Sequence, residues 1–229
     1  MTVTDVIIPA FNEAYSIQYV INDIPKSLIR KIVVVNNSST DHTKQIAIKA
    51  GAVVIDENKK GYGNACLTGI NYTAQDPPDI VVFLDGDYSD YPDELSFIVD
   101  PIINKQVDLV IGSRLRGKHE KGSLLPQAIF GNKLACFLIK LIYGVKFTDL
   151  GPFRAIRWES LVKLKMADTN YGWTVEMQIK AIKHQLKITE VPVSYRKRIG
   201  VSKITGTVSG TIKAGYKILY LIFKYSFSK

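Results

Sequence analysis

Cysteine is scarce in this chain of 229 residues, which contains only Cys66 and Cys136. The two lie far apart and neither shows metal-ligand spacing, so the sequence predicts reduced, mostly buried thiols in a cytosolic protein. The N-terminus shows little of a signal-sequence pattern, because it enters a strand pattern directly, without a basic region followed by an apolar stretch. We therefore do not expect export by a signal peptide.

Long hydrophobic runs are lacking as well. The apolar stretch 134–143 has ten residues, whereas a helix needs about 20 to span a bilayer. The stretch 212–227 is rich in Ile, Leu, Phe and Tyr, but Lys213, Lys217 and Lys224 on one helical side argue against a transmembrane helix. The pattern is typical of a helix in a membrane interface and equally of a helix docked on its own domain, and both remain open. Any membrane contact is expected to be peripheral.

Acidic residues are few in the last third of the chain. Residues 1–150 carry 15 Lys and Arg against 17 Asp and Glu, whereas residues 151–229 carry 15 against 4, a net charge of +11. This asymmetry predicts an anionic partner, such as a phosphorylated substrate, an acidic membrane surface or a nucleic acid. The sequence contains no recognised nucleic-acid-binding module, so we do not expect a nucleic acid.

The most informative segment is a strand pattern that ends on two carboxylates. The apolar run 80–84 is dense in β-formers and short enough to be a strand buried on both faces of a parallel sheet, and Asp85 and Asp87 follow it with one glycine between them. A break at Gly86 lets both carboxylates emerge at the carboxyl end of the strand, where open α/β sheets bind ligands. Two such oxygen donors suit Mg²⁺ or Mn²⁺ shared with the phosphates of a nucleotide.

Strand and helix patterns alternate along the first half of the chain. Together with 46% hydrophobic and 22% charged residues, which indicate a folded globular protein, this alternation predicts an α/β fold. The expected architecture is a doubly wound, mostly parallel sheet with helices on both faces. We expect strands at 3–10, 31–35, 52–55, 80–84, 108–112 and 188–195, and later helices at 126–143, 159–164, 174–183 and 212–227.

A third glycine is missing from the segment that begins at Gly61. In a dinucleotide-binding G-x-G-x-x-G motif it would fall at position 66, which is Cys66, and no acidic residue stands where a ribose partner is expected. The sequence therefore argues against a dehydrogenase. A short glycine loop that opens a helix still brings backbone N–H groups close to a phosphate or sugar.

Several segments, in this order and spacing, resemble the family 2 glycosyltransferases of GT-A fold, in particular the group related to dolichyl-phosphate mannose and glucose synthases. The resemblance covers residues 3–205 and implies inverting transfer of a hexose from a UDP- or GDP-sugar with a divalent metal. The segments that carry it are Ile8-Pro9-Ala10-Phe11-Asn12-Glu13, Asn36-Asn37-Ser38-Ser39-Thr40-Asp41, Gly61-Tyr62-Gly63-Asn64, Asp85-Gly86-Asp87, Gly112-Ser113-Arg114, Asp149-Leu150-Gly151-Pro152-Phe153-Arg154 and Val191-Pro192-Val193-Ser194-Tyr195-Arg196.

The resemblance assigns roles on the donor side. Asp85 and Asp87 are the expected ligands of Mg²⁺ or Mn²⁺, with Asp85 also facing the ribose. Asn37 stands where many relatives carry an aspartate that contacts the base, and an amide offers both a donor and an acceptor. The expected nucleotide-sugar contacts are Pro9, Asn12, Glu13, Asn37, Gly61, Asn64 and Asp85.

The acceptor side allows two chemistries. A phosphate acceptor is already largely anionic near neutral pH and needs cations rather than a base, and the residues chosen for it are Arg114, Arg154, Arg198, Ser202 and Lys203. A hydroxyl acceptor needs a carboxylate that takes its proton, for which Asp149 comes first and Glu176 second. Polyprenyl-phosphate synthases usually place a further arginine downstream of Gly-Ser-Arg, where this chain has Gln127-Ala128-Ile129-Phe130.

The sequence thus predicts a glycosyltransferase domain over residues 1–205 followed by an amphipathic helix at 206–229. The favoured acceptor is a polyprenyl phosphate at the cytosolic membrane face. Three alternatives stay open: a hydroxyl acceptor, a sugar-phosphate nucleotidyltransferase, and a non-catalytic domain that binds anionic lipid. The nucleotidyltransferase should show a glycine-rich signature with Arg just after the first strand, where this chain has Pro9-Ala10-Phe11-Asn12-Glu13. The sugar, the base and a homo-oligomeric state remain open.

Overall fold

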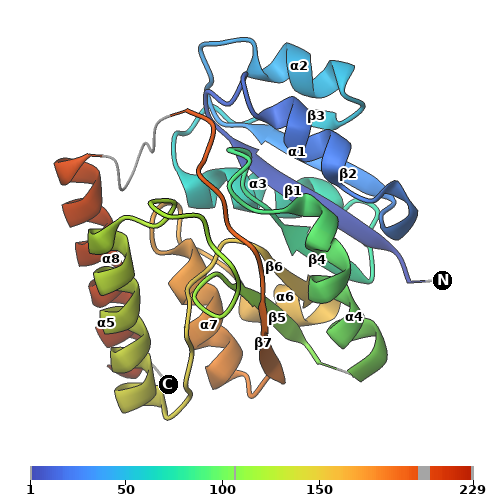
Figure 1. The fold of residues 1–229 in the computed structure, drawn as a ribbon. Helices are drawn as coiled ribbons and strands as arrows, with labels where there is room; N and C mark the ends of the chain where they lie inside the picture. The colour runs from blue at the N-terminus through green and yellow to red at the C-terminus, as the bar shows by residue number, and fades with distance from the viewer. Residues whose placement is uncertain (1, 106, 201–206, 228–229) are drawn as a thin grey trace.

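The computed structural model describes residues 2–105, 107–200 and 207–227. Within these residues the chain folds around a seven-stranded sheet of order β3-β2-β1-β4-β6-β5-β7, in which only β6 runs antiparallel to its neighbours (Figure 1). The strands are β1 (Thr4–Ala10), β2 (Lys31–Asn36), β3 (Val53–Asp56), β4 (Ile80–Phe83), β5 (Leu109–Ser113), β6 (Arg154–Arg157) and β7 (Ile188–Pro192).

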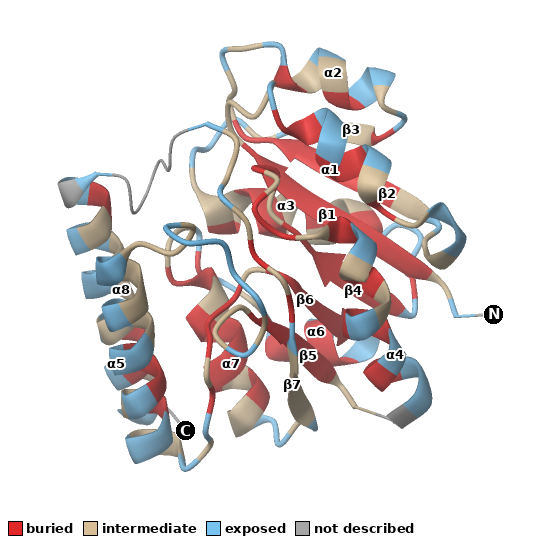
Figure 2. Cartoon of the chain, viewed as in Figure 1, coloured by how far each residue is buried: buried red, intermediate tan, exposed pale blue. Residues whose placement is uncertain are grey.

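Helices cover both faces of this sheet because alternate residues of the buried strands point to opposite sides. Ile7 of β1 lies in the hydrophobic cluster of one face, whereas Val6 and Ile8 lie in that of the other. The first face is covered by α3 (Tyr62–Thr73), α5 (Pro126–Tyr143), α6 (Trp158–Leu164), α7 (Trp173–Lys183) and α8 (Val208–Phe227), and the second by α1 (Ile17–Asp23), α2 (Thr43–Lys49) and α4 (Leu95–Lys105). Figure 2 shows the buried strands between these layers. The predicted α/β architecture is confirmed.

The sequence analysis did not predict strand β6. β6 has only four residues and an arginine at each end, which conceals it in the hydrophobic pattern, yet it inserts between β4 and β5. Arg154 is the register partner of both Phe83 and Ile111. This insertion brings the Asp149–Arg154 segment beside the strand end that carries Asp85 and Asp87.

The C-terminal helix α8 docks on the domain. It begins at Val208, four residues before the predicted start, and Leu221 and Ile222 enter the core. Tyr143 of α5 donates a hydrogen bond from its hydroxyl to the carbonyl of Ile222 at 2.6 Å. The inner face of α8 therefore packs on its own domain, which is one of the two arrangements that the sequence left open.

Candidate functional site

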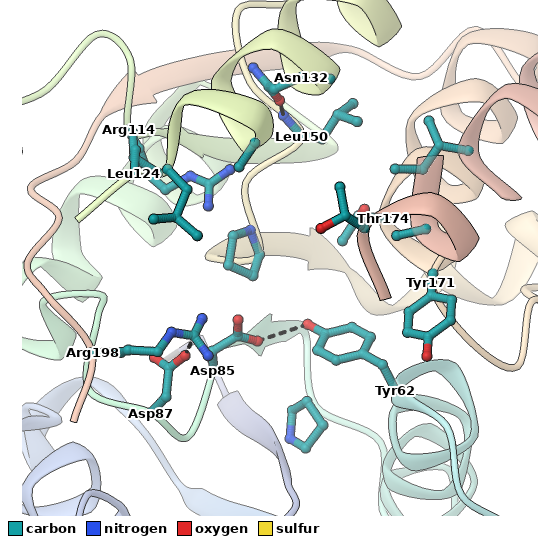
Figure 3. Close-up of a pocket in the computed structure, with 18 of the residues that line it drawn as sticks. Tyr62, Asp85, Asp87, Arg114, Leu124, Asn132, Leu150, Tyr171, Thr174 and Arg198 are labelled. Carbon is teal, nitrogen blue, oxygen red and sulfur yellow. Dashed lines mark hydrogen bonds and ion pairs between the residues drawn. The ribbon is translucent and has the colours of Figure 1, made fainter. Parts of the chain in front are cut away.

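A pocket of about 1100 Å³ opens at the carboxyl ends of β1, β4 and β5. Its polar end is lined by Asp85, Asp87, Arg114 and Arg198. Figure 3 shows Asp85, Asp87 and Arg198 grouped together, with Arg114 farther away beside Leu124. The pocket continues between α5 and α8, where its lining becomes apolar. Of the cations predicted at this edge of the sheet, Arg114 and Arg198 line the pocket together with Asp85 and Asp87.

Asp85 stands at the base of the polar end. Its carboxylate accepts a hydrogen bond from the hydroxyl of Tyr62 at 3.0 Å. Burial, followed by the charge of Asp87, raises the pKa of Asp85 to about 7. A cation beside this carboxylate would favour its ionised form, since an opposite charge lowers a carboxyl pKa.

Asp87 is fixed in orientation by its neighbours. The backbone N–H and the hydroxyl of Ser89 both donate to Oδ1 of Asp87, at 2.9 and 2.5 Å. The other oxygen, Oδ2, lies 2.7 Å from Nη2 of Arg198. Asp87 thus presents one oxygen toward the pocket, and the guanidinium of Arg198 lies against it.

Asp90 is a further carboxyl group in this region, buried like Asp87, and the sequence analysis missed it. Neither of its oxygens has a hydrogen-bond partner among the described residues. Burial, followed by the charge of Asp85, raises the pKa of Asp90 well above its usual range. Its position three residues after Asp87 gave no reason to expect a buried side chain, because a carboxylate in a loop usually faces solvent.

The carboxyl groups of this region are suited to a hard divalent cation. Asp85 and Asp87 offer oxygen donors, and one guanidinium, that of Arg198, is paired with Asp87. Among residues 2–105, 107–200 and 207–227 no group of three or more His, Cys, Asp or Glu is arranged to hold a metal ion. Two carboxylates without further protein ligands match Mg²⁺ or Mn²⁺, which complete their coordination with phosphate oxygens and water.

The part of the pocket where the sequence analysis expects the nucleoside is formed by the turns after β1 and β2. Pro9, Glu13, Asn37 and Gly61 line the pocket. The amide nitrogen of Asn37 donates to the carbonyls of Glu57 and Lys59, at 3.1 and 2.8 Å, and its oxygen accepts from the N–H of Gly61 at 2.8 Å. Both amide hydrogens of Asn37 are therefore used to hold the 57–61 loop.

Two predicted contacts of the nucleotide-sugar do not line the pocket. Asn12 has φ = 54° and accepts a hydrogen bond from the N–H of Thr40 on its side-chain oxygen at 2.8 Å. Asn64 donates to the carbonyls of Lys59 and Lys60 at 3.3 and 3.2 Å. Both asparagines brace the loops that carry the lining residues.

The glycines of the Gly61-Tyr62-Gly63 segment serve a close backbone approach. A Cβ on Gly63 would lie 2.0 Å from the carbonyl oxygen of Asp168, and one on Gly61 would lie 2.3 Å from that of Thr169. The N–H of Asn64 donates to the same Thr169 carbonyl at 3.0 Å. The start of α3 is therefore packed against the 168–170 segment.

Arg114 and Asp149, both predicted to act on the acceptor, form one ion pair. Nε and Nη2 of Arg114 donate to the two carboxylate oxygens of Asp149 at 2.8 and 2.7 Å, and the backbone N–H of Arg114 adds a third bond at 2.8 Å. Glu190 holds the segment from behind by accepting from the N–H of Asp149 at 3.1 Å. Arg114 lines the pocket, whereas the buried Asp149 does not. Asp149 is thus placed as the counter-ion of Arg114 and not as a proton acceptor.

Two predicted acceptor-side residues are turned into the core. The fully buried Arg154 donates to the backbone carbonyls of Leu150, Gly151 and Thr174. The prediction that Arg154 binds an acceptor phosphate is contradicted by this placement. Its guanidinium instead fixes the turn that follows Asp149, and burial lowers its pKa to about 10.

Glu176 is equally unavailable as a base. It is fully buried, accepts from the N–H of Asp168 at 2.7 Å and from the hydroxyl of Tyr225 at 2.7 Å, and forms an ion pair with Lys180 at 2.7 Å. It therefore ties α7 to α8. Ser202 and Lys203, the remaining predicted phosphate contacts, lie outside the described residues.

Other lining residues were not predicted from the sequence. Lys60 and Lys197 add positive charge to the polar end, and Tyr195 lies under the guanidinium of Arg114 at 5.1 Å. Tyr195 belongs to the Val191–Arg196 motif, so the sequence did contain a pattern from which its place in the pocket could have been predicted. The apolar end is lined by Leu124, Leu125, Ala128, Phe130, Gly131, Leu134 and Ala135 on one side and Thr211, Ala214, Gly215, Ile218 and Leu219 on the other.

Comparison with known proteins decides the family. The family model described as glycosyl transferase family 2 matches residues 5–164. The chain belongs to glycosyl transferase family 2. This glycosyltransferase is 32% identical over 210 residues to an uncharacterised protein of Methanocaldococcus jannaschii, with 88% of this chain and 86% of the relative covered. It is 28% identical to a UDP-N-acetylglucosamine–dolichyl-phosphate N-acetylglucosaminyltransferase of Methanococcus voltae, with 97% and 96% covered.

The fold of the glycosyltransferase also matches solved structures. Glucosyl-3-phosphoglycerate synthase from Mycobacterium tuberculosis, solved with Mn²⁺, UDP-glucose and phosphoglyceric acid, superposes with a TM-score of 0.79 at 22% identity. The match covers 98% of this chain and 80% of that chain. The glycosyltransferase therefore has the GT-A fold.

Proposed function

We propose that this glycosyltransferase moves a hexose from a UDP- or GDP-sugar, with Mg²⁺ or Mn²⁺, to a polyprenyl phosphate. The observation that carries the proposal is the continuity of one pocket from the charged group around Asp87 to an apolar groove between α5 and α8. A lipid phosphate has this same division into an anionic head and an apolar chain. The dolichyl-phosphate substrate in the name of the Methanococcus voltae relative supports the same acceptor class.

On the donor side, Asp85 and Asp87 would hold the cation, which supplies charge stabilisation for the leaving nucleoside diphosphate. Ser89 keeps the Asp87 carboxylate in one orientation through two hydrogen bonds. The turns carrying Pro9 and Gly61 bound the space for the nucleoside. These residues bind and orient the donor with its sugar toward the acceptor side.

On the acceptor side, Arg114 and Arg198 would bind the phosphate. Asp149 holds two of the nitrogens of Arg114, so the guanidinium has a fixed direction. A phosphate oxygen is largely ionised near neutral pH, since its second pKa is about 6, and it attacks the sugar carbon without a base. The burial of Asp149 and Glu176 away from the pocket agrees with a reaction that needs no proton acceptor. Attack from the side opposite the leaving diphosphate inverts the sugar carbon.

A donor and acceptor screen tests this function. UDP-glucose, UDP-N-acetylglucosamine and GDP-mannose are each incubated with Mn²⁺ and farnesyl phosphate, and the released nucleoside diphosphate is measured. We expect one donor to release its nucleotide only when Mn²⁺ and the lipid phosphate are both present. Release that is equally fast with phosphoglycerate or a simple alcohol, and indifferent to the lipid phosphate, would contradict the proposed acceptor.

Filling the groove should affect long acceptors selectively. Gly215 of α8 lines the groove, and a Cβ there would meet no atom within 4 Å, so Gly215→Leu projects its side chain into open space. We expect turnover with a long-chain polyprenyl phosphate to fall about tenfold, equivalent to about 1.4 kcal/mol. Turnover with a short water-soluble phosphate acceptor should change little. The control is Ser226→Leu, an exposed position of the same helix that does not line the groove. Equal losses for both acceptors would place the lipid elsewhere.

A further inference from the structure

The outer sides of α5 and α8 carry two apolar stripes. In α5 the exposed residues Phe130, Leu134, Phe137 and Leu141 recur at helical spacing, and in α8 the exposed residues Ile212, Tyr216, Tyr220, Phe223 and Phe227 do so. At about 100° per residue, each stripe occupies less than about a quarter of its helix circumference. The two helices lie side by side on one flank of the molecule (Figure 1). We refer to these nine residues as the α5–α8 face.

The side chains of the α5–α8 face do not pack on the core of their own domain. The opposite sides of both helices already pack on the domain, through Cys136 and Ile139 of α5 and Leu221 and Ile222 of α8. Figure 2 shows exposed residues along the outer side of both helices. Leu141 and Tyr216 are 70% and 71% exposed, far more than a side chain that covers its own domain.

The charged residues of α5 and α8 have a single sign. Neither helix contains an acidic residue, while α5 contains Lys133 and Lys140 and α8 contains Lys213, Lys217 and Lys224. Lys217 is used internally, since it pairs with Asp168 at 2.9 Å. The other four are exposed. Apolar residues flanked by lysines without acids complement a surface of anionic lipid better than a typical protein surface, which carries charges of both signs.

We propose that the α5–α8 face binds the surface of a bilayer containing anionic lipids, with the stripes at the headgroup boundary and the four lysines at lipid phosphates. The same face meets the mouth of the pocket, because Phe130 and Leu134 belong to the α5 stripe and also line the groove. A lipid acceptor could thus pass from the bilayer into the groove without crossing water. Membrane binding at this face would set the side from which the acceptor of the proposed function reaches the groove.

Vesicle co-sedimentation of the full chain tests the proposal. We expect the protein to pellet with vesicles of phosphatidylcholine and phosphatidylglycerol, to bind far less to phosphatidylcholine alone, and to be released by salt. Phe137→Glu combined with Tyr216→Glu should reduce binding at least tenfold, because a carboxylate would enter the boundary on each helix. Neither residue lines the pocket. The matched control is Phe97→Glu on α4, where the side chain is 55% exposed outside the α5–α8 face.

Charge reversal of Lys133 and Lys140 provides a second measurement, since each lysine near an anionic surface contributes about fivefold to binding. The proposal is overturned if the wild-type chain does not bind the mixed vesicles, or if the Phe137/Tyr216 variant binds as well as the wild type. It is also overturned if light scattering finds dimers that this variant separates while vesicles remain unbound, because the face would then join two copies. Vesicle binding requires no nucleotide-sugar, so its failure leaves the proposed transfer to be judged by the donor and acceptor screen.

Discussion

Asp87→Asn is expected to reduce sugar transfer by on the order of 1000-fold while the chain stays folded. Asparagine keeps the size of the side chain and the oxygen that accepts from Ser89, but it removes the negative charge that would hold the cation. The loss of the ion pair with Arg198 is offset in part by relief of repulsion from Asp85. Because the Asp87 side chain is buried and its partner Arg198 is only partly exposed, the unfolding midpoint must be measured alongside the rates.

The matched control is Asp93→Asn, an exposed aspartate of the same loop region that does not line the pocket. Initial rates with donor, acceptor and Mn²⁺ are compared for the wild type and both variants, and the unfolding midpoint is measured for each. Normal turnover by Asp87→Asn, or an equal loss in Asp93→Asn, would contradict the role of Asp87.

The second large effect concerns the ion pair of Arg114 and Asp149. Arg114→Lys and Asp149→Asn should each reduce turnover about 100-fold. The turnover of the double variant should be no lower than that of the less active single variant. The reason is that both substitutions break the same bidentate contact, which fixes the direction of the guanidinium. Breaking a buried pair typically costs about 3 to 5 kcal/mol, so the unfolding midpoint must be measured alongside the rates.

Slow donor hydrolysis in the absence of acceptor provides an internal control for this pair. It should be retained in all three variants, because Arg114 is expected to act on the acceptor phosphate and not on the donor. If Asp149→Asn alone abolishes transfer while Arg114→Lys remains active, Asp149 acts as a base and the placement of this pair as one unit is wrong.

The strand-end position of Asp85 and Asp87 could be predicted from the sequence because its information is local, whereas Asn12 and Asn64 were predicted to contact the donor and do not line the pocket. A buried strand that ends in Asp85-Gly86-Asp87 fixes where those carboxylates emerge, and the sheet order then brings Pro9 and Gly61 to the same edge. The backbone direction at a strand end depends on a few neighbouring residues, which the sequence displays.

The acceptor side could not be predicted in the same way because it depends on tertiary placement. Arg154 was expected in the pocket from its motif, but the antiparallel insertion of β6 directs its side chain to backbone carbonyls in the core. Glu176 accepts a hydrogen bond from Tyr225 across the α7–α8 contact, and no local sequence pattern predicts this contact. The apolar groove likewise requires α5 and α8 to lie together, although they are more than 60 residues apart.

The most direct test of the central claim is calorimetric titration of UDP and GDP into the wild-type chain and Asp87→Asn, with and without Mn²⁺. We predict that one of the two nucleotides binds the wild type more tightly when Mn²⁺ is present, and that Asp87→Asn loses this gain. If Mn²⁺ changes the binding of neither nucleotide, or if Asp87→Asn keeps the full gain, Asp85 and Asp87 do not hold a cation for the donor and the proposed site is wrong.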